Sequence, residues 1–192
     1  MIKIATHDSG TGERDLNLLH SIFSIFSKCQ DKTIKEQWEN GARYFDLRVC
    51  KTLHLAHSMW KSKVTIEEAL SMLNELSLND TENETHVMIT IEQNYKESVI
   101  KELIDYLMSL KKKYTNLTFI SINKKRPQWE TVVFYKYVKC ASDYSSVPWI
   151  TEWKKINFKN WKRYIPIPRV LHKNHVRKYT FNENYFVMVD FL

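Results

Sequence analysis

Short β-branched runs alternate with longer amphipathic segments along this chain, and this alternation limits the folds open to it. Strands are expected at Ile2–Thr6, Ala42–Val49, Leu53–His57, Val87–Gln93, Leu117–Ile122 and Tyr185–Leu192, with Val132–Val138 as a further candidate. Helices are expected at Asp15–Lys28, Thr33–Asn40, Ile66–Leu76 and Lys96–Tyr114. Strands that alternate with helices predict βα units around a parallel sheet. This alternation alone is compatible with both a closed barrel and an open doubly wound sheet.

The second strand shows how each predicted strand divides its residues between two faces. Tyr44, Asp46 and Arg48 share one face, and the opposite face is apolar and suited to lie under helices. Ionisable residues gather at or near the carboxyl ends of the strands: His7, Asp8, Asp46, Arg48, His57, Glu92 and Asp190. Barrels of α/β type place their active sites at that end. The alternative interpretation is an ion-pair network that only ties strand ends together.

Composition narrows the class of protein. The 192 residues are expected to form one domain, residues 1–192, and 43% hydrophobic content is that of an ordinary globular protein. No apolar run is long enough for a membrane-spanning helix. Three cysteines argue against a disulfide framework and favour a reducing compartment. The formal net charge of +7 indicates either a solvated cationic surface or attraction to an anion such as a lipid headgroup or a phosphorylated substrate.

All three glycines lie beside the two segments richest in chemically active residues: Gly10 and Gly12 follow His7 and Asp8, and Gly41 precedes Ala42–Val49. The residues gathered there suit proton transfer around an anion. Two histidines can act as base and acid near neutral pH, and a carboxylate beside each one fixes its tautomer. An arginine supplies a permanent, fork-shaped charge for phosphate oxygens. This set fits cleavage of a phosphodiester by an internal hydroxyl, with no metal required.

Two motifs carry a family resemblance. Thr6-His7-Asp8-Ser9-Gly10-Thr11 is followed by Gln37, then by Gly41-Ala42-Arg43-Tyr44-Phe45-Asp46-Leu47-Arg48-Val49 and Leu55-Ala56-His57. Together they resemble the X region of phosphatidylinositol-specific phospholipase C, in its bacterial, metal-independent branch and the related X-domain-only proteins. The resemblance implies a TIM-type (β/α) barrel with its active site at the carboxyl ends of the strands. Because the chain is shorter than the usual member, the barrel is expected to be trimmed or distorted.

The resemblance also implies a role for each catalytic residue. His7 would be the general base that takes the proton of the inositol 2-hydroxyl, and Asp190 would orient it. Arg48 would stabilise charge on the phosphate. His57, paired with Asp8, would protonate the diacylglycerol oxygen, and the first product would be cyclic inositol 1,2-phosphate. His7 and His57 are therefore expected to face a common site from opposite sides, with Arg48 between them.

Further residues are expected to bind the substrate. The resemblance assigns them as Asp46, Glu92, Asp143 and Tyr144. No cofactor is expected, since Arg48 stands where calcium-dependent relatives have a carboxylate. If the chain were metal-dependent, Asp8, Asp46 and Glu92 would supply hard oxygen ligands for Ca²⁺ or Mg²⁺.

The segment 148–169 mixes tryptophans with lysines and arginines, which suits a membrane interface, although the same tryptophans also suit packing against the barrel. The expected partners are a phospholipid or phosphorylated small-molecule substrate and, transiently, an anionic membrane surface. Nucleic acid is not expected. The chain is expected to be a monomer that is cytoplasmic or peripheral to a membrane, with secretion left open. Two alternative functions remain: a catalytically weak phosphoinositide-binding module, and a phosphodiesterase for a substrate without inositol.

Overall fold

The computed structural model describes residues 3–27, 29–80, 82–123, 138–140 and 186–189. Its strands are β1 (Lys3–Thr6), β2 (Ala42–Val49), β3 (His54–His57), β4 (Trp60–Thr65), β5 (Thr85–Ile91), β6 (Leu117–Asn123), β7 (Val138–Cys140) and β8 (Phe186–Val189). Its helices are the short 3₁₀ helix η1 (Ser9–Gly12), α1 (Leu18–Ser27), α2 (Ile34–Glu39), α3 (Ile66–Leu78) and α4 (Glu97–Lys113). The candidate strand Val132–Val138, apart from Val138, and the segment 148–169 lie outside the described residues. The other predicted strands and helices are confirmed wherever they fall on described residues, with small shifts at their ends.

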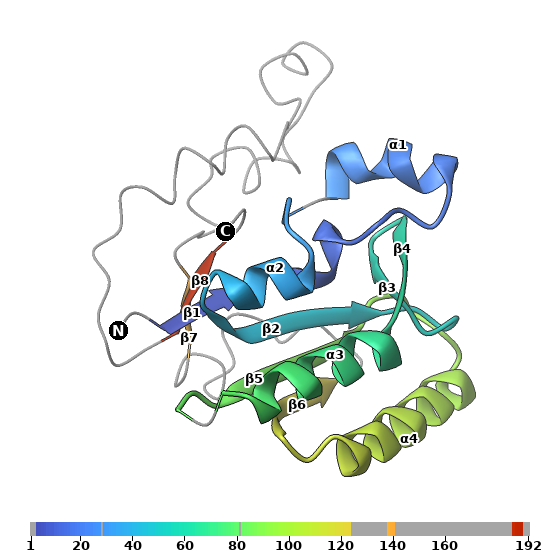
Figure 1. The fold of residues 1–192 in the computed structure, drawn as a ribbon. Helices are drawn as coiled ribbons and strands as arrows, with labels where there is room; N and C mark the ends of the chain where they lie inside the picture. Colours follow the sequence, from blue (N-terminus) through green and yellow to red (C-terminus); the bar gives the residue numbers. More distant parts are fainter. Residues whose placement is uncertain (1–2, 28, 81, 124–137, 141–185, 190–192) are drawn as a thin grey trace.

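Six strands form a parallel sheet in the order β6–β5–β2–β1–β8–β7. The first and last parts of the chain therefore lie side by side, since β1 pairs with both β2 and β8 (Figure 1). Within the described residues the sheet is not closed: its parallel part has β6 and β7 at its edges, and a branch from β2 through β3 ends at β4. The prediction of a parallel α/β fold is confirmed, whereas the closed form of a TIM-type barrel is not observed in this part of the chain.

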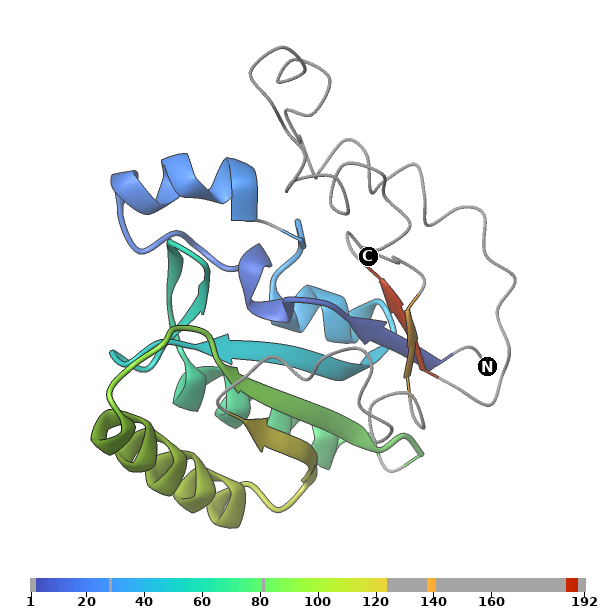
Figure 2. The ribbon, with the colours of Figure 1, turned by 180° about the vertical axis from the view of Figure 1, so that it is seen from behind.

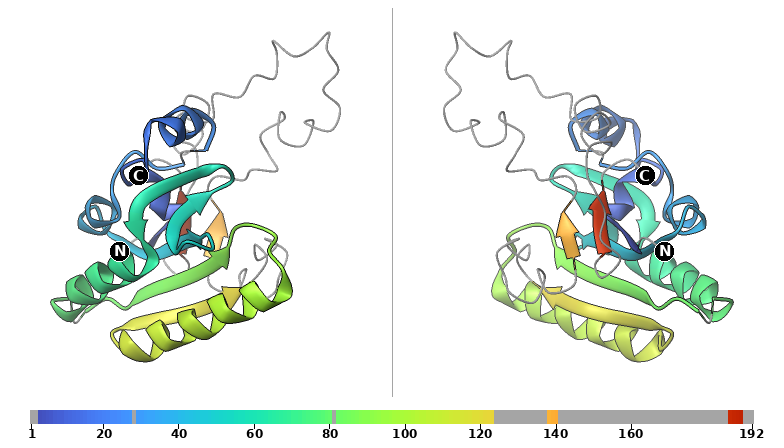
Figure 3. Two further views of the ribbon diagram at one scale, coloured as in Figure 1. Left: turned by 90° about the vertical axis from the view of Figure 1, so that its right-hand side faces the viewer. Right: turned by 90° about the vertical axis from the view of Figure 1, so that its left-hand side faces the viewer.

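The strand ending at His57 runs against the parallel strands, which corrects the expected arrangement. β3 is antiparallel to β2, with Val49 opposite Leu55, and it forms a hairpin with β4, which the sequence pattern did not predict. Only four residues separate β2 from β3 (residues 50 to 53). A parallel connection needs a dozen residues or more, so this short link can only reverse the chain. Figure 3 shows the hairpin standing beside α1.

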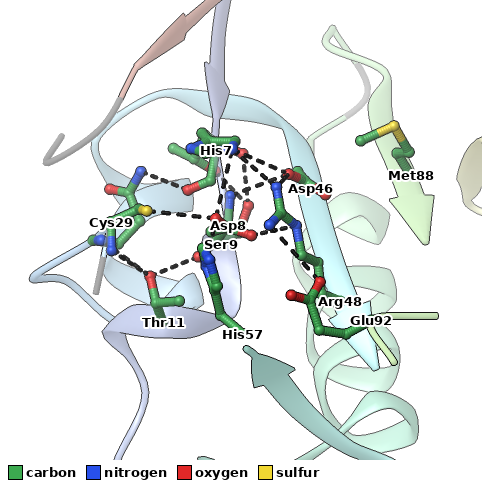
Figure 4. A network of polar contacts seen from close by, with 12 residues as sticks. His7, Asp8, Ser9, Thr11, Cys29, Asp46, Arg48, His57, Met88 and Glu92 are labelled. Carbon is green, nitrogen blue, oxygen red and sulfur yellow. Dashed lines mark hydrogen bonds and ion pairs between the residues drawn. The ribbon is translucent and has the colours of Figure 1, made fainter. Parts of the chain in front are cut away.

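One face of β2 and β5 packs against helices and forms the hydrophobic core. Phe45, Leu47 and Val49 of β2 are fully buried, together with alternate residues of β5. Apolar residues of α3 and α4 belong to the same cluster: Ile66, Ala69, Leu70, Leu73, Ile100, Leu103, Leu107 and Leu110. In the view from behind, β5 and β6 lie in front of α3 (Figure 2). The opposite face of β2 carries Asp46 and Arg48 and lines the candidate active site described below (Figure 4).

Local sequence signals fix the ends of two helices. Thr33 and Thr65 each form a capping box, in which the threonine hydroxyl accepts from the backbone N–H three residues later and a glutamate reaches back. The box predicted at Thr65 and Glu68 is confirmed. Gly41 then separates α2 from β2 with φ of +94°, a conformation that residues with a β-carbon rarely adopt. This turn starts β2, so it sets the register of the strand that carries Asp46 and Arg48.

Among the described residues, the longest helix is α4, and none has both the length and the apolar character required to cross a bilayer.

Candidate active site

Polar side chains from four elements meet at the carboxyl edge of the sheet (Figure 4). They follow or end β1, β2, β3 and β5: His7 and Asp8, Asp46 and Arg48, His57, and Glu92. All are buried except His57 and Glu92, which are partly exposed. Parallel strands deliver their carboxyl ends to one edge, and the β3–β4 hairpin brings His57 to the same place from the other direction. The six predicted residues that the structure describes therefore do come together.

His7 and Asp8 both enter this network, although neighbouring residues of a strand point to opposite faces. The reason is that β1 ends at Thr6 and Asp8 has left-handed backbone angles, φ 46° and ψ 47°. The turn is held by Thr11, whose backbone N–H and hydroxyl both donate to the carbonyl oxygen of Asp8, at 2.8 and 2.7 Å. The backbone N–H of Asp8 donates to Oδ2 of Asp46, at 3.3 Å.

Arg48 is the centre of the network. Its Nε forms an ion pair with Oδ1 of Asp8, and its Nη2 lies 3.0 Å from Oδ2 of Asp46 and 2.9 Å from Nε2 of His7. Its Nη1 lies 3.8 Å from Oε2 of Glu92. Burial alone would lower the pKa of Arg48, but Asp46, Asp8 and Glu92 outweigh it and raise that pKa above the ordinary value. The guanidinium therefore keeps its charge in this buried position.

Asp8 joins Arg48 to His57. Its Oδ2 lies 2.6 Å from Nδ1 of His57, while its Oδ1 contacts Arg48. Burial would raise the pKa of Asp8. The charge of Arg48, the charges of His57 and His7 when these rings are protonated, and the hydrogen bond from His57 outweigh burial and hold this pKa well below its usual range. An ionised Asp8 accepts a hydrogen bond from the N–H at Nδ1 of His57, which leaves Nε2 of that ring for chemistry. The expected pairing of Asp8 with His57 is present in the geometry.

His7 lies on the other side of Arg48. A guanidinium has donors only, so Nε2 of His7 must accept from Nη2 of Arg48 and carries a lone pair, as in the neutral ring. Among the described residues, the carboxylate oxygens nearest to Nε2 of His7 are Oδ2 of Asp8 at 3.5 Å and Oδ2 of Asp46 at 3.9 Å. Asp190, the expected partner of His7, lies outside the described residues. Oδ2 of Asp8 thus lies between the two histidine rings, 3.5 Å from Nε2 of His7 and 2.6 Å from Nδ1 of His57, while Arg48 contacts both His7 and Oδ1 of Asp8.

Glu92 links the hairpin to the sheet. Its Oε1 accepts from the backbone N–H of Ser58, at 2.9 Å, and Nε2 of Gln93 donates to the carbonyl oxygen of Ser58, at 3.2 Å. Ser58 has φ of 55°, so the turn that follows His57 is held in a left-handed conformation by these contacts. Glu92 thus positions His57 as well as contacting Arg48. The other predicted substrate contacts, Asp143 and Tyr144, lie outside the described residues.

The three carboxylates that could bind a divalent cation all contact the guanidinium of Arg48. Asp8, Asp46 and Glu92 each face a different nitrogen of Arg48. The guanidinium therefore sits among the three carboxylates, as expected if it acts as a built-in cation.

Sequence reasoning missed two residues beside Asp8. Cys29, just after α1, donates from Sγ to Oδ2 of Asp8 at 3.4 Å. Gln30 is fully buried, and its Nε2 donates to the carbonyl oxygen of His7 at 3.1 Å. No local pattern marks either one, because the segment that carries them is far from β1 in the sequence.

Comparisons with known proteins bear on the fold. No family model matches this chain, and no curated protein matches it. Among solved structures, a phosphatidylinositol-specific phospholipase C from Listeria monocytogenes is similar over 99% of this chain and 88% of its own, with 13% identity and a TM-score of 0.60. A Staphylococcus aureus structure of the same name is similar over 67% of this chain and 49% of its own, with 17% identity and a TM-score of 0.46. The fold of this chain is therefore similar to that of a bacterial phosphatidylinositol-specific phospholipase C.

Proposed function

We propose that this chain cleaves the phosphodiester of phosphatidylinositol-like lipids to give cyclic inositol 1,2-phosphate and diacylglycerol. One observation carries the proposal: Asp8 lies between the rings of His7 and His57, and Arg48 contacts both Asp8 and His7. This arrangement offers a base, a permanent positive charge and an acid within one site. The likeness of fold to a phospholipase C supports the choice of substrate class.

His7 is proposed as the base. Its Nε2 carries the lone pair, and this atom would take the proton from the inositol 2-hydroxyl as that oxygen attacks phosphorus. The negative charge that develops on the phosphate oxygens would be stabilised by Arg48, whose Nη2 already lies 2.9 Å from Nε2 of His7. No metal enters this step.

His57 is proposed as the acid. Asp8 holds Nδ1 of His57, so a proton on Nε2 would be the one donated to the diacylglycerol oxygen as the phosphorus–oxygen bond breaks. One proton is taken by His7 and one is given by His57, so the step is balanced.

A lipid substrate also requires contact with a membrane, and an apolar surface lies on the elements beside the site. Leu18, Leu19 and Ile22 of α1 are more than half exposed, and so is Met59 in the turn of the hairpin that carries His57. Nδ1 of His20 lies 3.0 Å from the carbonyl oxygen of Met59, which ties α1 to that turn. Exposed apolar groups of this kind favour binding at a lipid interface, so we infer a peripheral membrane location during catalysis.

Product analysis tests the proposal. The full chain is incubated with vesicles that contain phosphatidylinositol, with and without EDTA, and water-soluble products are identified by phosphorus NMR. Cyclic inositol phosphate formed in the presence of EDTA is the expected result. His7→Ala and His57→Ala should each abolish it, whereas His86→Asn, at the amino end of β5, serves as the matched control.

The other outcomes separate the remaining functions. Vesicle binding without turnover would identify a binding module. Turnover of another phosphodiester, but not of phosphatidylinositol, would identify a different substrate class. Loss of activity in EDTA that Ca²⁺ restores would assign Asp8, Asp46 and Glu92 to a metal instead of to Arg48 alone.

A further inference from the structure

A buried thiol touches the proposed acid–base network without a role in it. Cys29 is 3% exposed, and its Sγ lies 3.4 Å from Oδ2 of Asp8 (Figure 4). It lies in no disulfide bridge within the described residues. Cysteine, histidine and aspartate are three of the side chains that hold Zn²⁺ in proteins, and here one of each meets at a single point.

The spacing of these ligand atoms matches a tetrahedral metal site. One atom each from Cys29, Asp8 and His7 forms a group whose members all lie within 4.8 Å of one another. Oδ2 of Asp8 lies 3.4 Å from the thiol and 3.5 Å from Nε2 of His7. Bonds of roughly 2.0 to 2.3 Å around tetrahedral zinc separate neighbouring ligand atoms by about 3.3 to 3.5 Å. Two of the three ligand pairs are therefore already at the required separation.

Hydrogen bonds fix the thiol in this position. The hydroxyl of Thr11 accepts from the backbone N–H groups of Cys29 and Gln30, both at 3.0 Å, and donates to the carbonyl oxygen of Asp8. Gln30 in turn holds the carbonyl oxygen of His7. One hydroxyl thus connects the segment that carries Cys29 to the turn that carries both other ligands. Nη2 of Arg48 donates to Nε2 of His7 at 2.9 Å, so an ion bound to that atom would take the place of this hydrogen bond and move the guanidinium away from His7.

The charges around the three ligands favour a cation. Asp8, Asp46 and Glu92 are three carboxylates against the single guanidinium of Arg48. Arg48 contacts Asp8 through Oδ1, whereas the thiol lies against Oδ2. A sulfur ligand distinguishes this set from the all-oxygen set of Asp8, Asp46 and Glu92, because thiolates prefer Zn²⁺ and similar metals to Ca²⁺ or Mg²⁺.

We propose that Zn²⁺ binds to Cys29, Asp8 and His7 and thereby switches the site off. The thiol loses its proton to solvent, and bonds form from the metal to Sγ, to Oδ2 of Asp8 and to Nε2 of His7. The lone pair of His7 is then no longer available as a base, and Oδ2 of Asp8 no longer accepts from His57. The proposed inhibition by Zn²⁺ rests on the proposed function, because it requires that the chain cleaves phosphatidylinositol. The proposed binding of Zn²⁺ does not depend on that activity.

Binding is tested directly with Co²⁺ and Zn²⁺ on the full chain, kept reduced with a phosphine that does not chelate metal. The wild-type chain and Cys50→Ser should take up one Co²⁺ with a thiolate-to-cobalt charge-transfer band, which Cys29→Ser should lack. Cys50 is the matched control because its buried Sγ contacts Thr52 and the carbonyl of His54, outside this cluster. Zinc affinity should fall at least about tenfold in Cys29→Ser, since even an outer-shell loss costs roughly that much.

A second measurement needs no variant. Alkylation of the wild-type thiols, followed by peptide mass spectrometry, should show that Zn²⁺ protects Cys29 and leaves Cys50 unchanged. Equal zinc affinity in Cys29→Ser, a retained charge-transfer band in that variant, or unprotected Cys29 would each overturn the site.

Inhibition of turnover by Zn²⁺ is measured separately from Zn²⁺ binding. Zn²⁺ should stop turnover of phosphatidylinositol by the wild-type chain, EDTA should restore it, and Cys29→Ser should need at least about tenfold more Zn²⁺ for half inhibition, in step with its lower affinity. Zinc that binds at Cys29 yet leaves turnover unchanged would overturn the switch. A chain that binds zinc but never cleaves phosphatidylinositol would instead overturn the proposed function and leave the metal site in place.

Discussion

Nδ1 of His57 lies 2.6 Å from Oδ2 of Asp8, and this contact joins the β3–β4 hairpin to the end of β1. The other oxygen of the same carboxylate pairs with Arg48 of β2. Asp8 is therefore the junction of three elements, and it is fully buried there. A carboxylate in this position both orients a histidine and balances a buried guanidinium, so its loss should affect chemistry and stability together.

Asp8→Asn should destabilise the fold by about 3 kcal/mol or more, since removal of one partner of a buried ion pair leaves the other charge uncompensated. Urea unfolding at neutral pH measures this change. Asp105→Asn, at an exposed position of α4, is the control and should stay within about 0.5 kcal/mol of the original chain.

The same variant should also lose part of the acid sensitivity. The pKa of Asp8 is lowered in the folded chain. Its contribution to stability is therefore present above the unfolded value of about 3.9 and is lost as the pH falls through the folded value. Unfolding free energies measured from pH 5 downward should decline less steeply for Asp8→Asn than for the original chain. Parallel pH curves would contradict the depressed pKa.

Arg48→Lys should lower kcat/KM for phosphatidylinositol at least about 100-fold, the usual loss when a preorganised stabilising donor is removed from an active site. Lysine keeps the charge but offers one ammonium in place of the fork that reaches Asp8, Asp46, Glu92 and His7. Arg43→Lys is the control from the same strand, since Arg43 pairs with Asp80 and stacks on Trp38 outside the network. Activity within tenfold of the original in Arg48→Lys would argue against the proposed role.

Gly12→Ala and Gly41→Ala should lower the free energy of unfolding by different amounts, because one meets a steric clash and the other a disfavoured backbone angle. A β-carbon on Gly12 would lie 1.8 Å from the carbonyl oxygen of Lys32, which belongs to the backbone and cannot turn aside. A β-carbon on Gly41 has room, since Cδ1 of Ile4 would lie 3.9 Å away, but the positive φ of this residue disfavours any side chain. Gly41→Ala should cost about 1 to 2 kcal/mol, and Gly12→Ala distinctly more. Thermal unfolding of the two variants, compared side by side, decides the order.

Removal of apolar groups from α1 should weaken action on membranes. The double variant Leu18→Ser with Ile22→Ser should bind vesicles less and turn over vesicle substrate more slowly, while hydrolysis of soluble cyclic inositol phosphate stays unchanged. Leu78→Ser is the matched control, because Leu78 is 57% exposed at the end of α3. If Leu78→Ser weakens vesicle binding as much as the double variant does, α1 is not the membrane contact.

The alternation of apolar and polar residues was sufficient to predict which face of β2 and β5 lies under helices. Phe45 and Ile89 are in the core, whereas Asp46 and Arg48 are in the site, as the period of two requires. The capping box at Thr65 was equally predictable, because it depends on residues within one helical turn. Strand periodicity and helix capping depend on residues close together in the chain, so both can be predicted from the sequence.

The antiparallel direction of β3 was harder to predict from the sequence. Its apolar residues resemble those of the parallel strands, and only the shortness of the link after Val49 distinguishes it. The left-handed turn at Asp8 was also missed, since non-glycine residues seldom adopt such angles and nothing local demands it. Thr11 stabilises that turn, and its hydroxyl at the same time anchors residues from beyond α1.

Strand periodicity and helix signals are local, so the amino-acid sequence was sufficient to predict a parallel α/β sheet and the set of ionisable residues at its carboxyl edge. The pairing of those residues comes from the folded chain: Asp8 lies between Arg48 and His57, Arg48 contacts His7, and Cys29 contacts Asp8. The physical reason is that pairing depends on a turn of a few residues and on contacts between segments far apart in the chain. Neither leaves a repeating pattern in the sequence.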